Sequence, residues 1–132
     1  MTYEQQESGT TPFIKFDTEV NAYQIEGRSL AENAMEFYGN AIQWIDEHLK
    51  GKKTTAVLAI KLDYCNTSSY LGIAQVLHKL KELNDAGSAF TVKWSYEEGD
   101  EDWLEDGNNF QEASHLPFVF EAFESPPIEL EE

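Results

Sequence analysis

The sequence contains little cysteine, few basic residues and no long apolar run. Cys65 is the single cysteine among 132 residues, so the chain can form neither an intramolecular disulfide nor a Cys-x-x-Cys redox pair, and a zinc site built on several thiolates is excluded. No apolar stretch approaches the roughly 20 residues of a membrane span, and the polar start of the chain lacks the basic and apolar segments of a signal peptide. These absences predict a cytoplasmic protein with no membrane association.

Basic residues are outnumbered by acidic ones, 9 against 25, which gives a net charge of -16 and a pI of about 4.4. This charge repels nucleic-acid phosphates and anionic membrane surfaces, so it predicts protein partners with neutral or basic faces. An aromatic content of 13% argues against disorder. The length fits one domain, which we place at residues 11–123, between a flexible N-terminal arm (residues 1–10) and an acidic, proline-containing tail (residues 124–132).

The first half of the domain predicts a β-hairpin followed by a helix. Short apolar-rich runs at residues 13–16 and 23–25 flank a polar turn, as in paired antiparallel strands. Ser29 and Glu32 have the spacing of a capping box, which predicts that a helix starts there. The helix continues to Leu49, because apolar residues recur at spacings of three and four up to that position.

The second half predicts parallel crossover units. Residues 54–60 are almost continuously apolar, which is typical of a central strand buried on both faces. A helical pattern over 68–86 precedes a strand pattern over 90–96. A short helix within 100–111 and a last strand at 116–120 complete the domain. Together with the antiparallel hairpin, this order predicts an α/β domain with a mixed sheet covered by helices.

Four consecutive polar residues, Asn66-Thr67-Ser68-Ser69, follow the predicted central strand and begin the second predicted helix. Functional groups often lie beyond the carboxyl ends of strands in such a sheet. The surplus of hydroxyls favours a phosphorylation site, because a phosphate there meets free backbone N–H groups and the positive end of the helix dipole. A plain N-cap is the alternative interpretation, although a cap requires only one such residue.

Seven acidic residues occupy the ten positions from 97 to 106. They suggest a divalent cation site, but a calcium loop that begins at Asp100 would need a polar ligand at Leu104 and glycine at Glu105. We therefore interpret the run as a solvated or partner-facing surface. Trp103 lies within it, either as an apolar anchor for a partner or as a pin that holds the loop to the domain.

Signatures of bound metals and cofactors are missing from the sequence. The three histidines are too scattered for a metal motif, and neither a phosphate-binding loop nor a dinucleotide-binding glycine pattern occurs. Cys65 lacks the local signature of a cysteine enzyme. The sequence therefore predicts no cofactor, no metal and no catalytic residue.

A series of short tracts, taken in order, resembles the SiaC family of regulatory phosphoproteins over nearly the whole domain. The tracts are Thr11-Pro12 with Phe16-Asp17, Ile25-Glu26-Gly27-Arg28-Ser29 followed by Glu32-Asn33-Ala34, Glu36-Phe37-Tyr38, Tyr64 with Asn66-Thr67-Ser68-Ser69, Trp94-Ser95-Tyr96-Glu97, Asp100-Glu101-Asp102, and Leu116-Pro117-Phe118. The resemblance implies a fold similar to STAS domains, the fold of anti-sigma factor antagonists.

The resemblance also implies a non-catalytic partner switch in c-di-GMP signalling and biofilm control. A dedicated SiaB-like serine/threonine kinase phosphorylates members of the family and a SiaA-like PP2C-type phosphatase reverses this. The unphosphorylated form binds and activates a SiaD-like diguanylate cyclase. The acceptor threonine of the family motif corresponds to Thr67, and its neighbours Asn66, Ser68, Ser69 and Tyr70 become candidates for partner contact.

Further candidates for partner contact follow from the same tracts and from the acidic run. These are Arg28, Asp100, Glu101, Asp102 and Trp103. Cys65 stands where we expect an aromatic residue in relatives, a difference that concerns the partner surface rather than the acceptor. Two alternative functions stay open, an anti-sigma antagonist switch and a metal-dependent enzyme that uses the acidic run.

Overall fold

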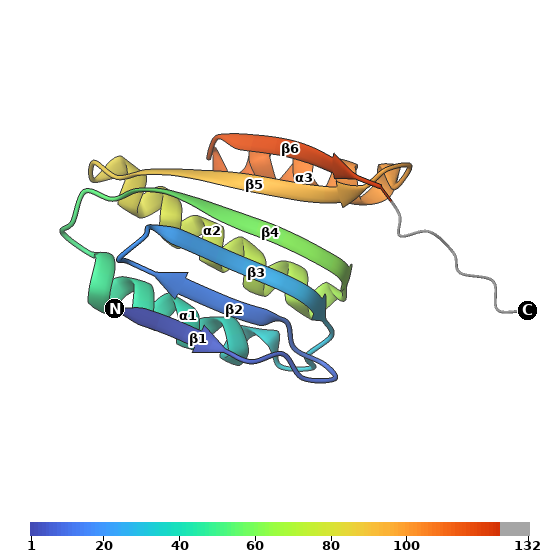
Figure 1. Cartoon of the computed structure of the whole chain (residues 1–132), viewed down its shortest axis with the longest axis horizontal. Helices are drawn as coiled ribbons and strands as arrows, with labels where there is room; N and C mark the ends of the chain where they lie inside the picture. Colours follow the sequence, from blue (N-terminus) through green and yellow to red (C-terminus); the bar gives the residue numbers. More distant parts are fainter. Residues whose placement is uncertain (125–132) are drawn as a thin grey trace, which may run out of the picture.

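Three helices pack against one face of a six-stranded sheet in the computed structural model, which describes residues 1–124 (Figure 1). In chain order the elements are β1 (Thr2–Gln5), β2 (Phe13–Asp17), β3 (Ala22–Ser29), α1 (Ala34–Leu49), β4 (Thr55–Cys65), α2 (Thr67–Asp85), β5 (Ala89–Glu97), α3 (Glu101–Ser114) and β6 (Phe118–Phe123). The strands lie side by side in this order. β1 to β3 are antiparallel and β3 to β6 are parallel, each parallel connection being a helix, so the predicted mixed sheet is confirmed.

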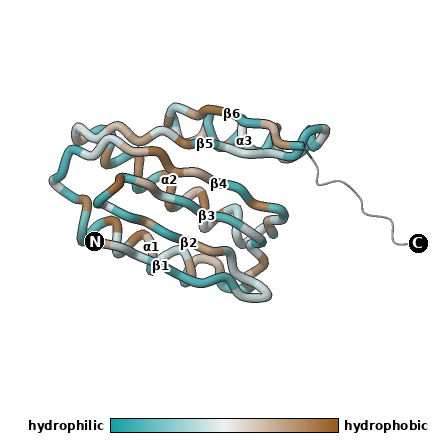
Figure 2. Tube along the Cα trace, viewed as in Figure 1, coloured by the Kyte–Doolittle hydropathy of each residue, from teal (hydrophilic) through white to brown (hydrophobic). Residues whose placement is uncertain are grey.

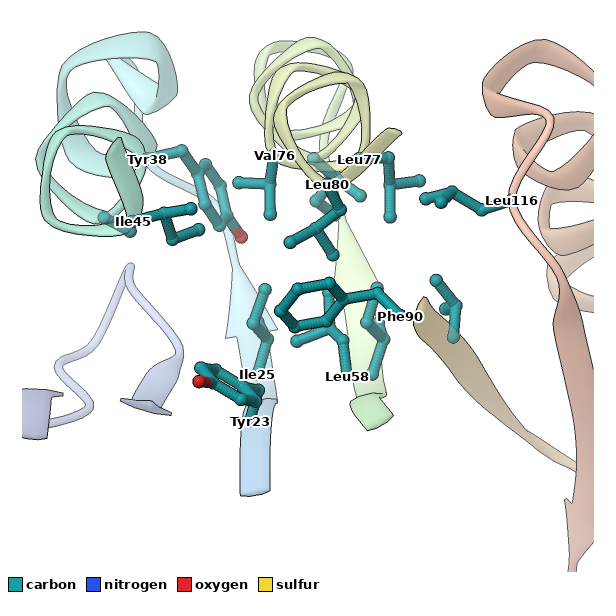
Figure 3. Packing of buried hydrophobic residues seen from close by; sticks show 14 of the residues in the cluster. Tyr23, Ile25, Tyr38, Ile45, Leu58, Val76, Leu77, Leu80, Phe90 and Leu116 are labelled. Atoms are coloured by element: carbon teal, nitrogen blue, oxygen red, sulfur yellow. The ribbon is translucent and has the colours of Figure 1, made fainter. Parts of the chain in front are cut away.

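The hydrophobic core lies between the sheet and the helices. Side chains from α1 and α2, among them Tyr38, Ile45 and Val76, point toward Leu58 and Phe90 on the strands (Figure 3). Hydrophobic residues recur along helices and strands, separated by hydrophilic ones (Figure 2). Burial of each large apolar side chain contributes roughly 1.5–3 kcal/mol, so this layer supplies most of the force that holds the helices in place.

β4 is buried on one face only, contrary to the expectation for residues 54–60. Ala56, Leu58 and Ile60 are buried, whereas Val57, on the opposite side of the strand, is 45% exposed. The reason is that all three helices cover the same face of the sheet (Figure 1). Apolar side chains of moderate size also lie on the open face. The sequence of this alternating strand therefore resembles that of a strand buried on both faces.

The first helix begins at Ala34 rather than at Ser29. β3 continues through Ser29, which pairs with Cys65 of β4, and Asn33 is the residue that caps α1. The Asn33 side chain accepts a hydrogen bond from the Glu36 backbone N–H at 3.3 Å and donates one to the Glu36 carboxylate at 2.9 Å. The sequence therefore contains two overlapping cap-like spacings, and strand pairing selects the second.

The predicted flexible arm is wrong for Thr2–Gln5, which form the edge strand β1 against β2. The Tyr3 ring lies 5.8 Å from the ring of Phe16 and 6.0 Å from that of Trp44. A single inward side chain thus holds an otherwise polar strand. The predicted acidic tail lies outside the described residues, apart from Glu124.

The remaining predicted elements are present with shifted ends. α2 and β5 each begin one residue earlier than predicted, α3 extends three residues further, and the last strand begins at Phe118. Two glycines allow close packing of the later helices: a Cβ added at Gly72 would overlap the ring of Tyr38, and one at Gly107 would overlap Trp94. These contacts fix α2 against α1 and α3 against the sheet.

Candidate functional site

The candidate site lies where β4 ends and α2 begins, beyond the carboxyl ends of the parallel strands, as predicted. Asn66 is the N-cap of α2, and its side-chain oxygen accepts a hydrogen bond from the Ser69 backbone N–H at 2.9 Å. Its side-chain nitrogen donates to the Ala31 carbonyl at 3.2 Å, and its backbone N–H donates to the Ser29 carbonyl at 3.0 Å. Asn66 therefore connects α2 to the segment between β3 and α1.

Ser69 is fully buried in a network of hydroxyl groups. Its hydroxyl donates to the Ser29 carbonyl at 2.9 Å, and the Ser29 hydroxyl donates to Ser69 Oγ at 2.6 Å. Each hydroxyl carries one hydrogen, so the Tyr38 hydroxyl is the donor in its 2.7 Å contact with Ser29 Oγ. Burial and the Ser29 hydrogen bond leave Ser69 inaccessible to an enzyme.

Ser68 is held by the start of α1. Its hydroxyl accepts a hydrogen bond from the Ala34 backbone N–H and donates one to the Glu32 carbonyl, both at 3.2 Å. The Ser68 side chain therefore satisfies a backbone donor at the N-terminus of α1 as well as a carbonyl before it. Phosphorylation of this hydroxyl would remove the hydrogen that it donates to the Glu32 carbonyl.

Thr67 has a different environment from the two serines. It is the first residue of α2, it is exposed, and its hydroxyl makes no hydrogen bond within residues 1–124. The first turn of α2 carries no acidic residue, so the positive end of the helix dipole is not neutralised by a carboxylate. Of the three hydroxyls, only that of Thr67 is both reachable and free to accept a phosphate without loss of an existing bond.

Tyr70 links the first turn of α2 to α3. Its hydroxyl donates to the Asp106 carboxylate, and its ring stacks on that of Phe110 with centroids 5.7 Å apart. Burial is the largest cause that raises the pKa of Tyr70, and the Asp106 carboxylate raises it further. Tyr70 therefore stays protonated and holds the two helices together.

Cys65 lies half-buried at the end of β4, directly before the cap. Burial, followed by the nearby Asp106 charge, raises the pKa of its thiol to about 12. Since the thiolate is the reactive form, this environment keeps Cys65 in its unreactive thiol form at neutral pH.

No hydrogen bond or ion pair within residues 1–124 joins the other predicted contact residues to Thr67, although the Trp103 ring lies 6.2 Å from that of the neighbouring Tyr70. Arg28 is exposed near the end of β3, opposite Tyr64 in the strand register. The acidic residues at the start of α3 are Asp100, whose side chain caps the helix, and Glu101 and Asp102, which are exposed.

Trp103 does not face solvent, contrary to the expectation of a partner-facing anchor. Its ring stacks on Trp94 with centroids 4.5 Å apart, and its indole N–H donates to the Ser95 carbonyl at 3.2 Å. It holds α3 against the sheet, which was the alternative interpretation.

Within residues 1–124, no group of three His, Cys, Asp or Glu side chains is placed to hold a metal ion.

Sequence reasoning missed the residues that build the floor of the site, Ser29, Tyr38 and Asp106. Ser29 carried a signal, a polar residue before an apolar helix pattern, but that signal also fits a cap. Tyr38 precedes Cys65 by 27 residues and Asp106 follows Asn66 by 40, so only the fold brings them close to the site. No helix within the described residues is long and apolar enough to cross a membrane.

The chain belongs to the SiaC family of regulatory phosphoproteins, whose family model matches residues 4–123. Among solved structures, SiaC of Pseudomonas aeruginosa is similar with a TM-score of 0.82 and 26% identity, over 93% of this chain and 99% of that one. The SiaC chain in a crystal structure of the diguanylate cyclase SiaD in complex with its activator SiaC, also from P. aeruginosa, gives a TM-score of 0.83 and 27% identity, over 92% and 99%. An uncharacterized protein of P. aeruginosa strain UCBPP-PA14 is 29% identical over 113 residues, which are 86% of this chain and 90% of the relative.

Proposed function

We propose that this chain is a non-catalytic partner switch whose unphosphorylated form binds and activates a diguanylate cyclase, and that phosphorylation of Thr67 ends this interaction. The observation that carries the proposal is the difference among three adjacent hydroxyls. Ser68 and Ser69 are engaged in hydrogen bonds, whereas Thr67 is exposed at a helix start without acidic residues. The SiaC chain of the cyclase complex has the same fold over 92% of this chain, which supports the choice of output.

A phosphate on Thr67 would affect a partner surface in two ways. It adds a charge of about -1.5 to -2 to a chain that already carries -16. It also lies near exposed apolar groups, since Tyr64 precedes it by three residues and Leu71 follows it by one helical turn, both 59% exposed. Burial of these groups under a partner would require dehydration of the dianion, which is costly.

The switch requires enzymes that add and remove the phosphate. We assign these roles to a SiaB-like kinase and a SiaA-like PP2C-type phosphatase, on the basis of family membership, and we place all partners with this protein in the cytoplasm. Asn66, Ser68 and Ser69 then serve the switch by holding the first turn of α2 in a fixed geometry. Tyr70 fixes the same turn to α3.

The test combines phosphorylation with cyclase activation. Purified wild-type protein, Thr67→Ala and the matched control Ser68→Ala are incubated with the kinase of the same organism and analysed by intact-mass spectrometry. We expect one phosphate on the wild type and on Ser68→Ala, and none on Thr67→Ala. Phosphorylation of Thr67→Ala to the wild-type level would show that the acceptor is elsewhere.

The output is tested with the diguanylate cyclase of the same organism. We expect c-di-GMP synthesis to rise when unphosphorylated protein is added and to return to its basal rate with the phosphorylated form. Pull-down from the native host provides an independent check. Recovery of an anti-sigma kinase in place of a cyclase would contradict the proposed output.

A further inference from the structure

β6 is an edge strand, and its outer side carries unpaired backbone groups. It ends the sheet opposite β1 and has one neighbouring strand, β5 (Figure 1). The Pro117 and Phe123 carbonyls point toward β5, where they accept hydrogen bonds from backbone N–H groups at 2.9 and 2.8 Å. Backbone groups alternate in direction along a strand, so those of Phe118, Phe120 and Ala122 point outward. Within residues 1–124 no strand pairs with these outward N–H and C=O groups.

The two edges of the sheet are protected to different degrees. β1 has four residues and is polar except for its inward tyrosine, and its Glu4 contacts Lys15 at 3.9 Å. β6 has six residues, all of them apolar except Glu121, and its Val119 is 56% exposed. The Glu121 carboxylate is itself neutralised by Lys93 at 3.1 Å. An apolar edge strand without net charge favours pairing with another strand, which proteins otherwise prevent with charged residues or proline.

We propose that β6 pairs antiparallel with β6 of a second copy of the chain, about a two-fold axis beside Phe120. In this register Phe120 lies opposite its own copy and Phe118 lies opposite Ala122, so outward residues meet outward residues along the whole strand. Each strand then donates three hydrogen bonds and accepts three, one through each outward N–H and C=O group. The two sheets become one continuous sheet. This inference goes beyond the proposed function and does not depend on it.

Side-chain charge selects the same register. A shift of two residues in one direction would place Glu121 directly opposite its own copy, and like charges in that position are destabilising. A shift in the other direction would leave Ala122 beyond the end of the second strand. In the proposed register Glu121 lies opposite Val119 on the open face, and two Phe120 rings meet on the helix side. Aromatic cross-strand pairs of this kind contribute roughly 0.2–1 kcal/mol.

The helix beside this edge also limits charge repulsion between two copies. Gly107 of α3 faces Phe120 of β6, and Asp106 turns toward α2, where it accepts the Tyr70 hydroxyl. At about 100° per residue, the side of α3 away from α2 lies toward the free edge. Its residues are uncharged, although the helix contains five acidic residues and the chain has a net charge of -16. They are Leu104, Asn108 and Gln111.

Pairing at β6 leaves the start of α2 open in each copy. α3 contacts β6 through Gly107 and α2 through Asp106, so it separates the edge from α2. Thr67 lies exposed at the first position of α2. The dimer therefore carries two accessible Thr67 side chains.

Sedimentation velocity of the full chain alone, from about 1 to 200 µM, tests the pairing. We expect the wild type to change from monomer to dimer over this range. Val119→Glu places a carboxylate opposite Glu121, and Ala122→Pro removes an outward N–H without touching the bonds to β5. Val57→Glu is the matched control, since Val57 is 45% exposed on β4, which has a strand on each side. We expect both β6 variants to dimerise at least about tenfold more weakly and the control to stay within about twofold, with folds verified by circular dichroism and thermal unfolding.

Disulfide trapping tests the register. Opposite residues of a pair without mutual backbone hydrogen bonds have Cα atoms about 4.5 Å apart, within the range of a disulfide. An equimolar mixture of Val119→Cys and Glu121→Cys should therefore form a mixed disulfide more readily than either variant alone. The wild type is the control, because Cys65 is half-buried and burial raises the pKa of its thiol. Bridging of Glu121→Cys alone to the level of the mixture would overturn the proposed register.

Two results would overturn the pairing itself. One is a wild type that stays monomeric up to about 200 µM; if the β6 variants then lose affinity for the cyclase, the edge belongs to a strand of that partner. The other is a dimer that Val119→Glu and Ala122→Pro leave intact, because such a dimer forms through another surface. Neither result concerns phosphorylation of Thr67, so failure of the pairing is distinguishable from failure of the proposed function.

Discussion

The starts of α2 and α3 have the same type of side-chain cap and opposite chemistry. In each, an Asx side chain accepts a hydrogen bond from the backbone N–H three residues later: Asn66 from Ser69 at 2.9 Å and Asp100 from Trp103 at 3.0 Å. The next two residues are hydroxyls in α2 and carboxylates in α3. Thr67 thus occupies in α2 the position that Glu101 occupies in α3.

The difference shows why a phosphate suits only one of the two helices. The positive end of the α3 dipole is already neutralised by Asp100, Glu101 and Asp102, so a further dianion there would meet repulsion. The first turn of α2 has no carboxylate, and a phosphate on Thr67 would supply the charge that Glu101 supplies to α3. In a chain with a net charge of -16, a helix start without a carboxylate indicates a position that can accept an anion.

The largest expected effect comes from a carboxylate placed at Ser69, two residues after Thr67 and in the protein interior. Ser69→Asp would put a charge into a fully buried site whose neighbours are hydroxyls, with no cation among its bonded partners. We expect a loss of about 3 kcal/mol or more in the free energy of unfolding, measured with guanidinium chloride. Ser69→Ala, which removes hydrogen bonds without adding charge, should lose about 1–2 kcal/mol. Equal losses for the two variants would mean that the site tolerates charge and that Thr67 is not distinguished by exposure.

A smaller effect concerns the bond that holds the two helix starts together. Tyr70→Phe removes the hydrogen bond to the Asp106 carboxylate, so we expect a loss of about 1.5 kcal/mol at pH 8. The pKa of Tyr70 is raised in the folded protein, mainly by burial, so the native state keeps its proton at a pH where the unfolded tyrosine loses it. The contribution is complete below about pH 10 and decreases as the pH rises above it.

Guanidinium unfolding at pH 8 and at pH 10.5 tests this prediction. The difference between wild type and Tyr70→Phe should be smaller at the higher pH. Tyr64→Phe is the control, since Tyr64 is exposed and makes no side-chain hydrogen bond within residues 1–124. A difference that is independent of pH would show that the folded protein does not raise the pKa of Tyr70.

Periodicity was sufficient to predict the elements that bury several side chains. α1 and α2 each contribute at least five buried residues at helical spacing, and β5 alternates over most of its length. β1 could not be predicted, because Tyr3 alone faces the core and the strand depends on pairing with β2. Local pattern also cannot show which faces of a sheet the helices cover, which is why β4 was expected to be buried on both.

The contiguous part of the site could be located from sequence, whereas its supporting contacts could not. Asn66 to Ser69 form one motif, and its position after a strand predicts a helix start. The ranking of Thr67 above Ser68 and Ser69 depended on family resemblance, since nothing local separates three neighbouring hydroxyls. The separation is produced by Ser29 and by the start of α1, which reach the motif through the sheet pairing and the packing of α1 on α2.

The smallest expected effect tests the comparison of the two helix starts directly. Thr67→Asp adds a carboxylate at the first position of α2, so we expect the free energy of unfolding to rise by about 0.3–1 kcal/mol at low ionic strength. Glu101→Gln removes the equivalent charge from α3 and should lower it by a similar amount. Both effects should shrink in 1 M salt, because the charges are exposed and screened. If Thr67→Asp instead destabilises the protein as salt is lowered, repulsion from the acidic surface outweighs the dipole, and the α2 start is not the anion-accepting end that its composition indicates.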